Sequence, residues 1–176
     1  PYYNPAGEPL LTARGMAPEH GYGFYLINLA QHLFGMPSEV FAVMSSFNCA
    51  GNPDYDINDL ENIILKFPGG QQFSIILNMT ARACLRHAYS FYGSAGRIYW
   101  PECPPHFNSP IQLVKGGVSV LADSVSGVRA GVIPNWHLPM VQDFVDALRE
   151  DRDPRCTIES AVATALITEA AIRSAS

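Results

Sequence analysis

The stretch PEHGYGFYLINLAQHLFGMP, residues 18–37, predicts the helix around which the rest of the chain is organised. Pro18 and Glu19 are typical of a first helical turn, because proline needs no amide partner there and an acid favours the positive end of the helix dipole. Residues 35–37 form an ordinary C-terminal signal of glycine followed by proline. We therefore expect a helix of about four turns that ends at Phe34.

One face of this helix carries polar side chains. Gly21, Tyr25, Asn28 and His32 follow one another at intervals that place them on one side of a helix. A separate stripe is apolar and consists of Leu26, Leu29, Ala30 and Leu33. The polar row has two interpretations at this stage: a site at a domain junction, or polar groups that find structural partners, as such groups in helices usually do.

A run of strands follows the helix, and two further helices close the chain. Alternating apolar and polar residues predict strands at 39–47, 59–67, 71–81, 87–93 and 96–100, the last four as two hairpins. Residues 111–114 and 118–121 fit edge strands, and helices are expected at 138–150 and 158–173. This grouping predicts the α+β fold class, with an open, mainly antiparallel sheet and helices packed on one face.

Ile76 interrupts the polar row of the strand at 71–81. Either the second face of the sheet is also partly covered, or Ile76 is a single exposed isoleucine.

Composition narrows the class of protein. The chain has 176 residues, enough for one domain, and its net charge of −5 argues against a nucleic-acid or membrane-surface partner. It contains no stretch long enough to cross a bilayer and no signal peptide, so we expect a soluble, cytoplasmic protein. Four cysteines without a CxxC pair favour free thiols in a reducing compartment over a zinc site or a disulfide framework.

Several motifs of catalysis and cofactor binding are missing. The sequence has no GxGxxG, Walker A, HExxH or GxSxG pattern, so this chain alone is not expected to hold the phosphates of a cofactor. His20, His87 and His106 are too far apart in sequence to indicate a metal site.

Residues 21–35 resemble the first helix of the C-terminal domain of the Gfo/Idh/MocA oxidoreductases. That family usually shows Asp-x-Gly-x-His-x-x-Asp, and a glucose–fructose oxidoreductase-like subset has Tyr for the His and Asn for the second Asp. Gly23, Tyr25 and Asn28 fall in register with this subset. The family's strand-turn, its hairpin and its last two helices are similar to residues 67–70, 92–98, 141–148 and 169–175.

The resemblance implies half of a two-domain enzyme. An N-terminal Rossmann domain, which this chain lacks, would bind NAD or NADP and carry a catalytic lysine in a Glu-Lys-Pro motif. The C-terminal domain would supply the wall of the substrate site and an open sheet for homodimerisation, and it would be inactive alone. The start at Pro1 agrees with a fragment. Substrates of the family are sugars, cyclic polyols or related diols.

The resemblance also assigns roles to residues. Tyr25 would be the catalytic acid/base, helped by the lysine, because a nearby cation favours the phenolate. Asn28 would hold a substrate hydroxyl through its donor and its acceptor. Gly21 occupies the place of the family's first Asp and leaves space for a bulkier substrate. His137, beside Trp136, is a candidate substrate contact or an ordinary loop residue, and Arg14 is a remote candidate.

Two other functions stay open. A ligand-sensing or regulatory relative would keep the fold without redox chemistry, and the missing Asp at Gly21 favours it, whereas Tyr25 and Asn28 favour the enzyme. An autonomous dimerisation module is the third interpretation.

Overall fold

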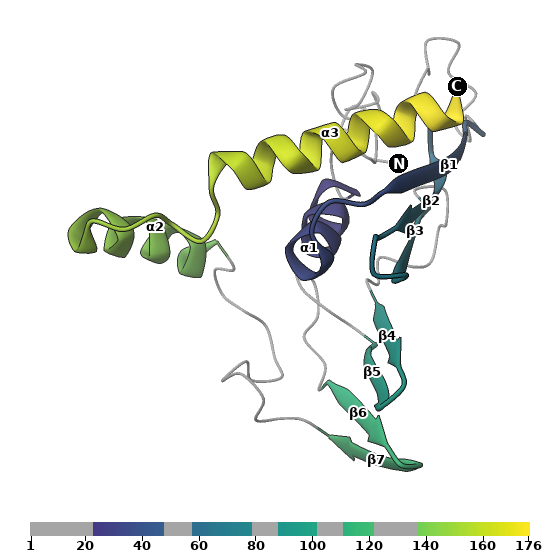
Figure 1. Cartoon of the computed structure of the whole chain (residues 1–176), viewed down its shortest axis with the longest axis horizontal. Coiled ribbons are helices and arrows are strands. Elements are labelled where there is room, and N and C mark those ends of the chain that lie inside the picture. Colours follow the sequence, from purple (N-terminus) through teal and green to yellow (C-terminus); the bar gives the residue numbers. More distant parts are fainter. Residues whose placement is uncertain (1–22, 48–57, 79–87, 102–110, 122–136) are drawn as a thin grey trace, which may run out of the picture. The chain divides into compact units, whose positions relative to one another are not determined.

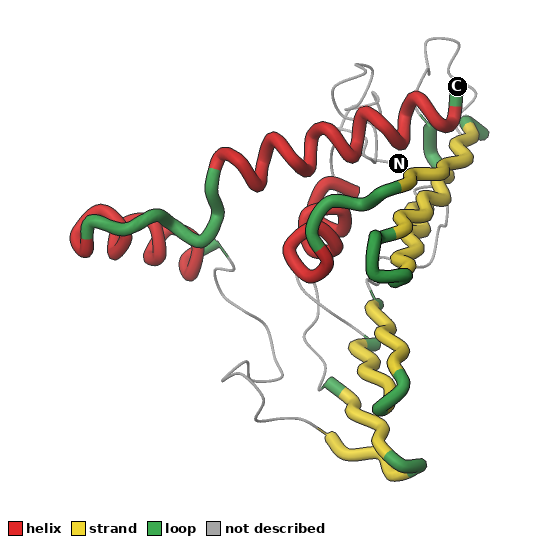
Figure 2. Tube along the Cα trace, in the orientation of Figure 1, coloured by secondary structure: helices red, strands yellow, loops and turns green. Residues whose placement is uncertain are grey.

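The computed structural model describes residues 23–47, 58–78, 88–101, 111–121 and 137–176. Contacts divide the chain into two compact units, which are described separately. The first unit comprises residues 1–82 and 155–176, and the second comprises residues 83–154. Figures 1 and 2 show the helices and strands of both units.

The first unit is a three-stranded antiparallel sheet covered by two helices. Its elements are α1 (Phe24–Phe34), β1 (Glu39–Ser45), β2 (Leu60–Lys66), β3 (Gln72–Asn78) and α3 (Ile158–Ala175). The strand order is β1-β2-β3, and α1 and α3 lie on the same side of the sheet (Figure 1). The fold class is α+β, as the grouping of elements predicted.

The core of this unit lies between the sheet and the two helices. Alternate residues of the strands point into it, among them Ile63 and Leu65 of β2 and Ile75 of β3. Ile27 of α1 and Ile167 of α3 meet them from the other side. Full burial of one such side chain contributes about 1.5–3 kcal/mol, so this layer supplies much of the stability of the unit.

The predicted end of the first helix is confirmed. The backbone of Gly35 has φ +79°, a left-handed conformation that glycine adopts without strain, and its N–H donates to the carbonyl of Gln31. The rings of Phe34 and Phe67 then pack with their centroids 5.2 Å apart, which holds the end of α1 against the β2–β3 turn. Residues 18–22, where the helix was expected to begin, lie outside the described residues.

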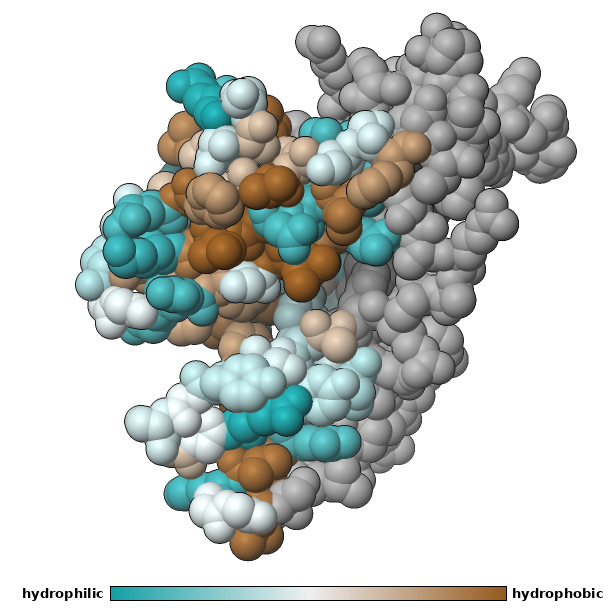
Figure 3. All heavy atoms as spheres, turned by 90° about the vertical axis from the view of Figure 1, so that its right-hand side faces the viewer, coloured by the Kyte–Doolittle hydropathy of each residue, from teal (hydrophilic) through white to brown (hydrophobic). Residues whose placement is uncertain are grey.

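The outer face of the sheet carries an apolar patch, which consists of Phe41, Val43, Ile64 and Ile76. Strand pairing places Phe41 opposite Ile64, and Val43 opposite Asn62, which in turn pairs with Ile76. All four apolar side chains are exposed, and Ile76 is 70% exposed. Hydrophobic side chains accordingly gather at the surface in Figure 3, which views the molecule from the right-hand side of Figure 1. Ile76 is therefore part of a patch and not a single exposed isoleucine.

The second unit contains a four-stranded antiparallel sheet and a helix. Its elements are β4 (Tyr89–Gly93), β5 (Gly96–Trp100), β6 (Gln112–Lys115), β7 (Val118–Leu121) and α2 (Leu138–Glu150), and the strand order is β4-β5-β6-β7. The predicted hairpin at 87–93 and 96–100 is confirmed over its described part. The described strands between residues 59 and 100, expected in one sheet, are divided between two sheets, because β3 pairs only with β2 and β4 only with β5.

Three further expectations concern membrane spans, metal sites and cysteines. Among the described helices, none is long and apolar enough to span a membrane. The described residues also include no group of three or more metal-ligating side chains that could hold an ion. Cys156 is a free, exposed thiol, and the cysteines at 49, 84 and 103 lie outside the described residues.

Candidate functional site

Tyr25 lies on the first turn of α1, and its side chain is 57% exposed. The helix turns its buried residues, Ile27 and Ala30, toward the core, so that Tyr25 is on the solvent side. His32, on the last turn, is also exposed. A phenol on the exposed side of a well-packed helix is both accessible to a small molecule and held on a rigid element.

Asn28 has a different environment from Tyr25. Its side-chain nitrogen donates two hydrogen bonds to α3, one to the hydroxyl of Ser160 and one to the hydroxyl of Thr164, each 2.9 Å long. Thr164 is fully buried, and its own hydroxyl donates to the carbonyl of Ser160 at 2.8 Å. The hydroxyl of Ser160 also approaches the side-chain oxygen of Gln31 at 3.5 Å. These four residues form a polar seam between α1 and α3.

The polar seam changes what Asn28 can offer a ligand. Both hydrogens of its amide are used by α3, so the expected contact through donor and acceptor together is reduced to the side-chain oxygen. No donor to that oxygen exists in the part of the chain that the structure describes. Of the two interpretations of the polar row, structural partners therefore account for the side-chain nitrogen of Asn28. Its two hydrogen bonds hold α1 against α3.

Sequence reasoning did not find Ser160 and Thr164. Their spacing of four residues on an alanine-rich helix was a detectable signal, since two hydroxyls then share one face. Their partner, however, lies 132 to 136 residues earlier in the chain. No local pattern links positions so far apart.

The other candidate residues lie outside the described residues or in the second unit. Gly21, Arg14 and Trp136 lie outside the described residues. His137 is exposed and belongs to the second unit, where its carbonyl accepts the backbone N–H groups of Met140 and Val141 at the start of α2. Its observed role is thus at a helix terminus.

Both lysines of the chain lie on strands. The chain contains two lysines, Lys66 and Lys115. Lys66 is exposed on β2 and forms an ion pair with Glu39 at 2.6 Å, and Lys115 ends β6 in the second unit.

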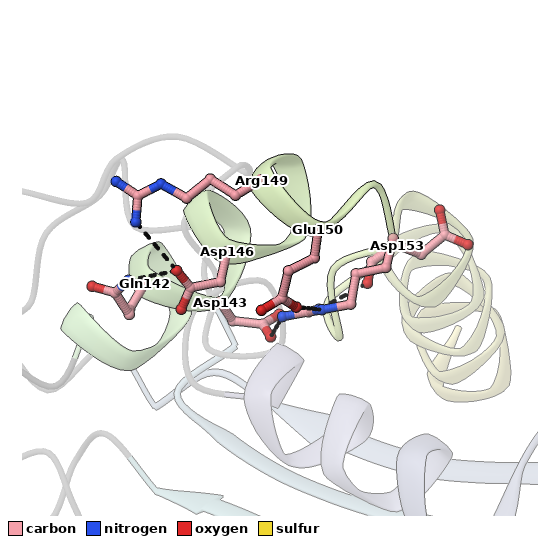
Figure 4. Close-up of polar contacts among 7 residues, drawn as sticks. Gln142, Asp143, Asp146, Arg149, Glu150 and Asp153 are labelled. Atoms are coloured by element: carbon pink, nitrogen blue, oxygen red, sulfur yellow. Dashed lines mark hydrogen bonds and ion pairs between the residues drawn. The ribbon is translucent and has the colours of Figure 1, made fainter.

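Two sets of charged groups lie at the ends of helices, one at the start of α3 and one after α2. At the start of α3, the pKa of Glu159 is lowered by a hydrogen bond from its own backbone N–H and by one from the Thr157 hydroxyl. Arg152 follows α2 and binds Glu150 at 2.7 Å and Asp143 at 3.0 Å, and these two bonds raise its pKa. Figure 4 shows this cluster together with Arg149, which approaches Asp146 at 3.6 Å. Both sets stabilise helix ends.

Comparison with protein families identifies the class of this chain. Residues 20–176 match the Gfo/Idh/MocA family, described as "Oxidoreductase family, C-terminal alpha/beta domain". The chain belongs to this family and represents its C-terminal domain. Comparison with curated proteins found no match.

Solved structures share the fold. An oxidoreductase from Agrobacterium radiobacter, in complex with NAD+, L-tartaric acid and magnesium, has a TM-score of 0.74 at 16% identity, over 97% of this chain and 50% of that one. Aldose-aldose oxidoreductase from Caulobacter crescentus, complexed with glycerol, has a TM-score of 0.70 at 20% identity, over 87% and 43%. Biliverdin reductase from Synechocystis, with biliverdin and NADP+, has 0.68 at 14%, over 86% and 44%. The chain spans about half the length of these proteins.

Proposed function

We propose that this chain is the substrate-binding and dimerisation half of a cytoplasmic, NAD(P)-dependent oxidoreductase that acts on a sugar, a cyclic polyol or a related diol. The observation that carries the proposal is the exposed phenol of Tyr25 on α1, in a domain that belongs to an oxidoreductase family. The substrate class is supported by the small hydroxylated molecules, glycerol and L-tartaric acid, that are bound to two proteins of similar fold.

Tyr25 is the proposed acid/base. Oxidation of an alcohol removes a proton from oxygen and a hydride from carbon. The phenol oxygen of Tyr25 takes the proton, and it returns the proton when the reaction runs in reverse. A lysine from another domain favours the phenolate form by its positive charge.

The nicotinamide cofactor, NAD or NADP, would accept the hydride and would be bound by a separate N-terminal domain. The described strands form only antiparallel pairs, whereas dinucleotide-binding domains are built on parallel βαβ units. The chain without such a domain is therefore expected to be inactive.

The remaining candidates have narrower proposed roles. Asn28 presents its side-chain oxygen to a substrate hydroxyl, because its nitrogen is bound to Ser160 and Thr164. Gly21 leaves room beside Tyr25 for a bulkier substrate, and His137 contributes a further substrate contact. Substitution of Gly21 by Asp tests the proposed role of Gly21, since an unchanged substrate preference would count against extra room for a bulkier substrate.

Homodimerisation is proposed through the outer face of the β1–β3 sheet. The apolar patch of Phe41, Val43, Ile64 and Ile76 has the composition of an interface core, and contiguous exposed apolar patches mark interaction sites.

The test compares the full-length protein with its Tyr25→Phe variant while NAD(P)H absorbance is followed across sugars, inositols and cyclic diols. We expect kcat to fall about 10²–10⁴-fold with cofactor binding intact. Tyr89→Phe is the matched control, since it removes a phenol hydroxyl from the second unit and keeps the ring that packs on Trp100. Retained turnover in the Tyr25→Phe protein would exclude the proposed acid/base role.

A sensor function is the second candidate, and it is favoured by Gly21 in place of the family's acid. A wild-type protein that binds the cofactor yet turns over no compound of the panel would favour the sensor over the enzyme.

A further inference from the structure

A cation on the second sheet is held between two aromatic rings. The guanidinium carbon of Arg97 on β5 lies 5.1 Å from the ring centroid of Tyr92 and 4.8 Å from that of Tyr99. Tyr92, on β4, is the direct cross-strand partner of Arg97, and Tyr99 is two residues further along β5. All three side chains therefore point to the same face of the sheet. We call these three residues the Arg97 clamp.

No acidic residue neutralises this cation in the described part of the chain. None of the ion pairs among the described residues includes Arg97, and its buried Nε atom has no hydrogen-bond partner there. The four strands β4 to β7 contain no Asp or Glu, although the chain as a whole has a net charge of −5. A basic site without a counter-ion on an acidic protein attracts anions.

The chemistry of the Arg97 clamp selects the kind of anion. Aromatic rings that meet a guanidinium through its flat faces leave the N–H groups at its edge available for hydrogen bonds, and the Nε atom of Arg97 is buried without such a partner. That edge forms paired hydrogen bonds to a planar carboxylate. Ser90 and Gln112 pair with Tyr99 across β4 and β6 and therefore lie on the same face, where they add a hydroxyl and an amide.

We propose that the Arg97 clamp binds a small organic carboxylate of the polyhydroxy-acid class. Arg97 holds the carboxylate, and the hydroxyl and amide groups around it receive the hydroxyl groups of the ligand. Tyr92 is 75% exposed and Arg97 is half-buried, so the site is open to a ligand on one side. The proposal does not depend on Tyr25 or on any turnover.

A protein partner is the alternative occupant, and the opposite face of the same sheet suits it better. Ile98, Leu113 and Val118 are exposed there, and such apolar side chains are what the core of a protein interface requires. The face of the Arg97 clamp instead presents tyrosine, serine and glutamine side chains around one cation, with half-buried Val114 opposite Arg97 on β6. This composition favours a polar small molecule.

Isothermal titration calorimetry of the full-length protein with D-gluconate tests the proposal, and sorbitol serves as the neutral analogue. We expect saturable gluconate binding that weakens at least tenfold in Arg97→Gln and is absent for sorbitol. Arg149→Gln, which removes an exposed arginine from α2, is the matched control and should bind gluconate as the wild type does. Thermal unfolding checks that each variant is folded.

Two further variants separate the outcomes. Tyr92→Leu removes one ring and keeps the charge, and it should also weaken gluconate binding. Tyr25→Phe should leave gluconate binding unchanged. A loss of gluconate binding in this variant would indicate that the ligand binds beside α1, and it would overturn the proposal. Equal binding of gluconate and sorbitol, unaltered binding in Arg97→Gln, or a change of oligomeric mass in Arg97→Gln without a change in gluconate affinity would also overturn it.

Discussion

The side-chain nitrogen of Asn28 lies 2.9 Å from the hydroxyl oxygen of Thr164, which is 136 residues further along the chain and fully buried. A second bond of the same length reaches Ser160, one turn earlier on α3. The helix that carries Tyr25 is thus hydrogen-bonded to the last helix of the chain through one amide group, in addition to the core packing of Ile27 and Ile167. This polar seam lies beside the residue proposed to exchange a proton with the substrate.

Asn28→Ala is therefore expected to lower stability more than an ordinary surface change. The substitution leaves the hydroxyls of Ser160 and Thr164 without their donor, at a cost of about 1–3 kcal/mol in the free energy of unfolding. Urea unfolding measures this, with Gln72→Ala at the exposed start of β3 as the control. Equal losses in the two variants would show that the polar seam contributes nothing specific.

Gly96→Ala should destabilise the second sheet. Gly96 has φ +153°, and a Cβ atom there would lie 2.2 Å from the carbonyl oxygen of Val114 on β6. Strain of this kind costs about 1–3 kcal/mol or more. Gly93→Ala is the matched control across the same hairpin, because its Cβ would meet nothing closer than 3.8 Å. Thermal unfolding of both variants checks the prediction, which fails if their melting temperatures agree.

Ile76→Lys should disrupt the proposed dimer. The substitution places a charge in the apolar patch, and a charge buried in an interface without a partner is costly. Light scattering at about tens of micromolar should give dimer mass for the wild type and monomer mass for the variant, for an interface of about 1,200–2,000 Å². Leu166→Lys, on the exposed side of α3, controls for an added surface charge. A monomeric wild type would contradict the proposed interface.

Glu159 should make stability depend on pH in the acid range. Its folded-state pKa is lowered, so the carboxylate favours the folded protein when ionised. That contribution is present above the ordinary value of 4.5 and is lost as the pH falls through the lower, folded-state pKa. The stability difference between wild type and Glu159→Gln, measured by urea unfolding from pH 7 downward, should shrink over this window. A difference that stays constant through the acid range would refute the assignment.

Much of the secondary structure followed from local patterns. The helix was predicted to end at Phe34 because Gly35 and Pro37 follow it, and the helix at 138–150 was predicted with the bounds that α2 has. The alternation of β3 correctly separated Ile75 and Leu77, which are buried, from Ser74 and Asn78, which are exposed. These features depend on residues within a few positions of one another, so the sequence contains them directly.

The contacts of the candidate residues were not predicted. The sequence alone picked out Tyr25 and Asn28, through their spacing and the resemblance to a family to which the chain does belong. It contained no sign that the nitrogen of Asn28 is bound by Ser160 and Thr164. Which atoms of a polar side chain remain available to a ligand depends on its neighbours in space.

By itself, the sequence determined the order of the described helices and strands and, to within a few residues, most of their ends, because periodicity, glycine and proline act locally along the backbone. Only the tertiary structure decided that the strands divide into two sheets, that Ile76 joins Phe41, Val43 and Ile64 in the apolar patch, and that Arg97 lies between two tyrosine rings. Each of these relationships joins residues through strand pairing or helix packing. Such contacts are selected by the free energy of the whole folded chain, and no short stretch of sequence specifies them.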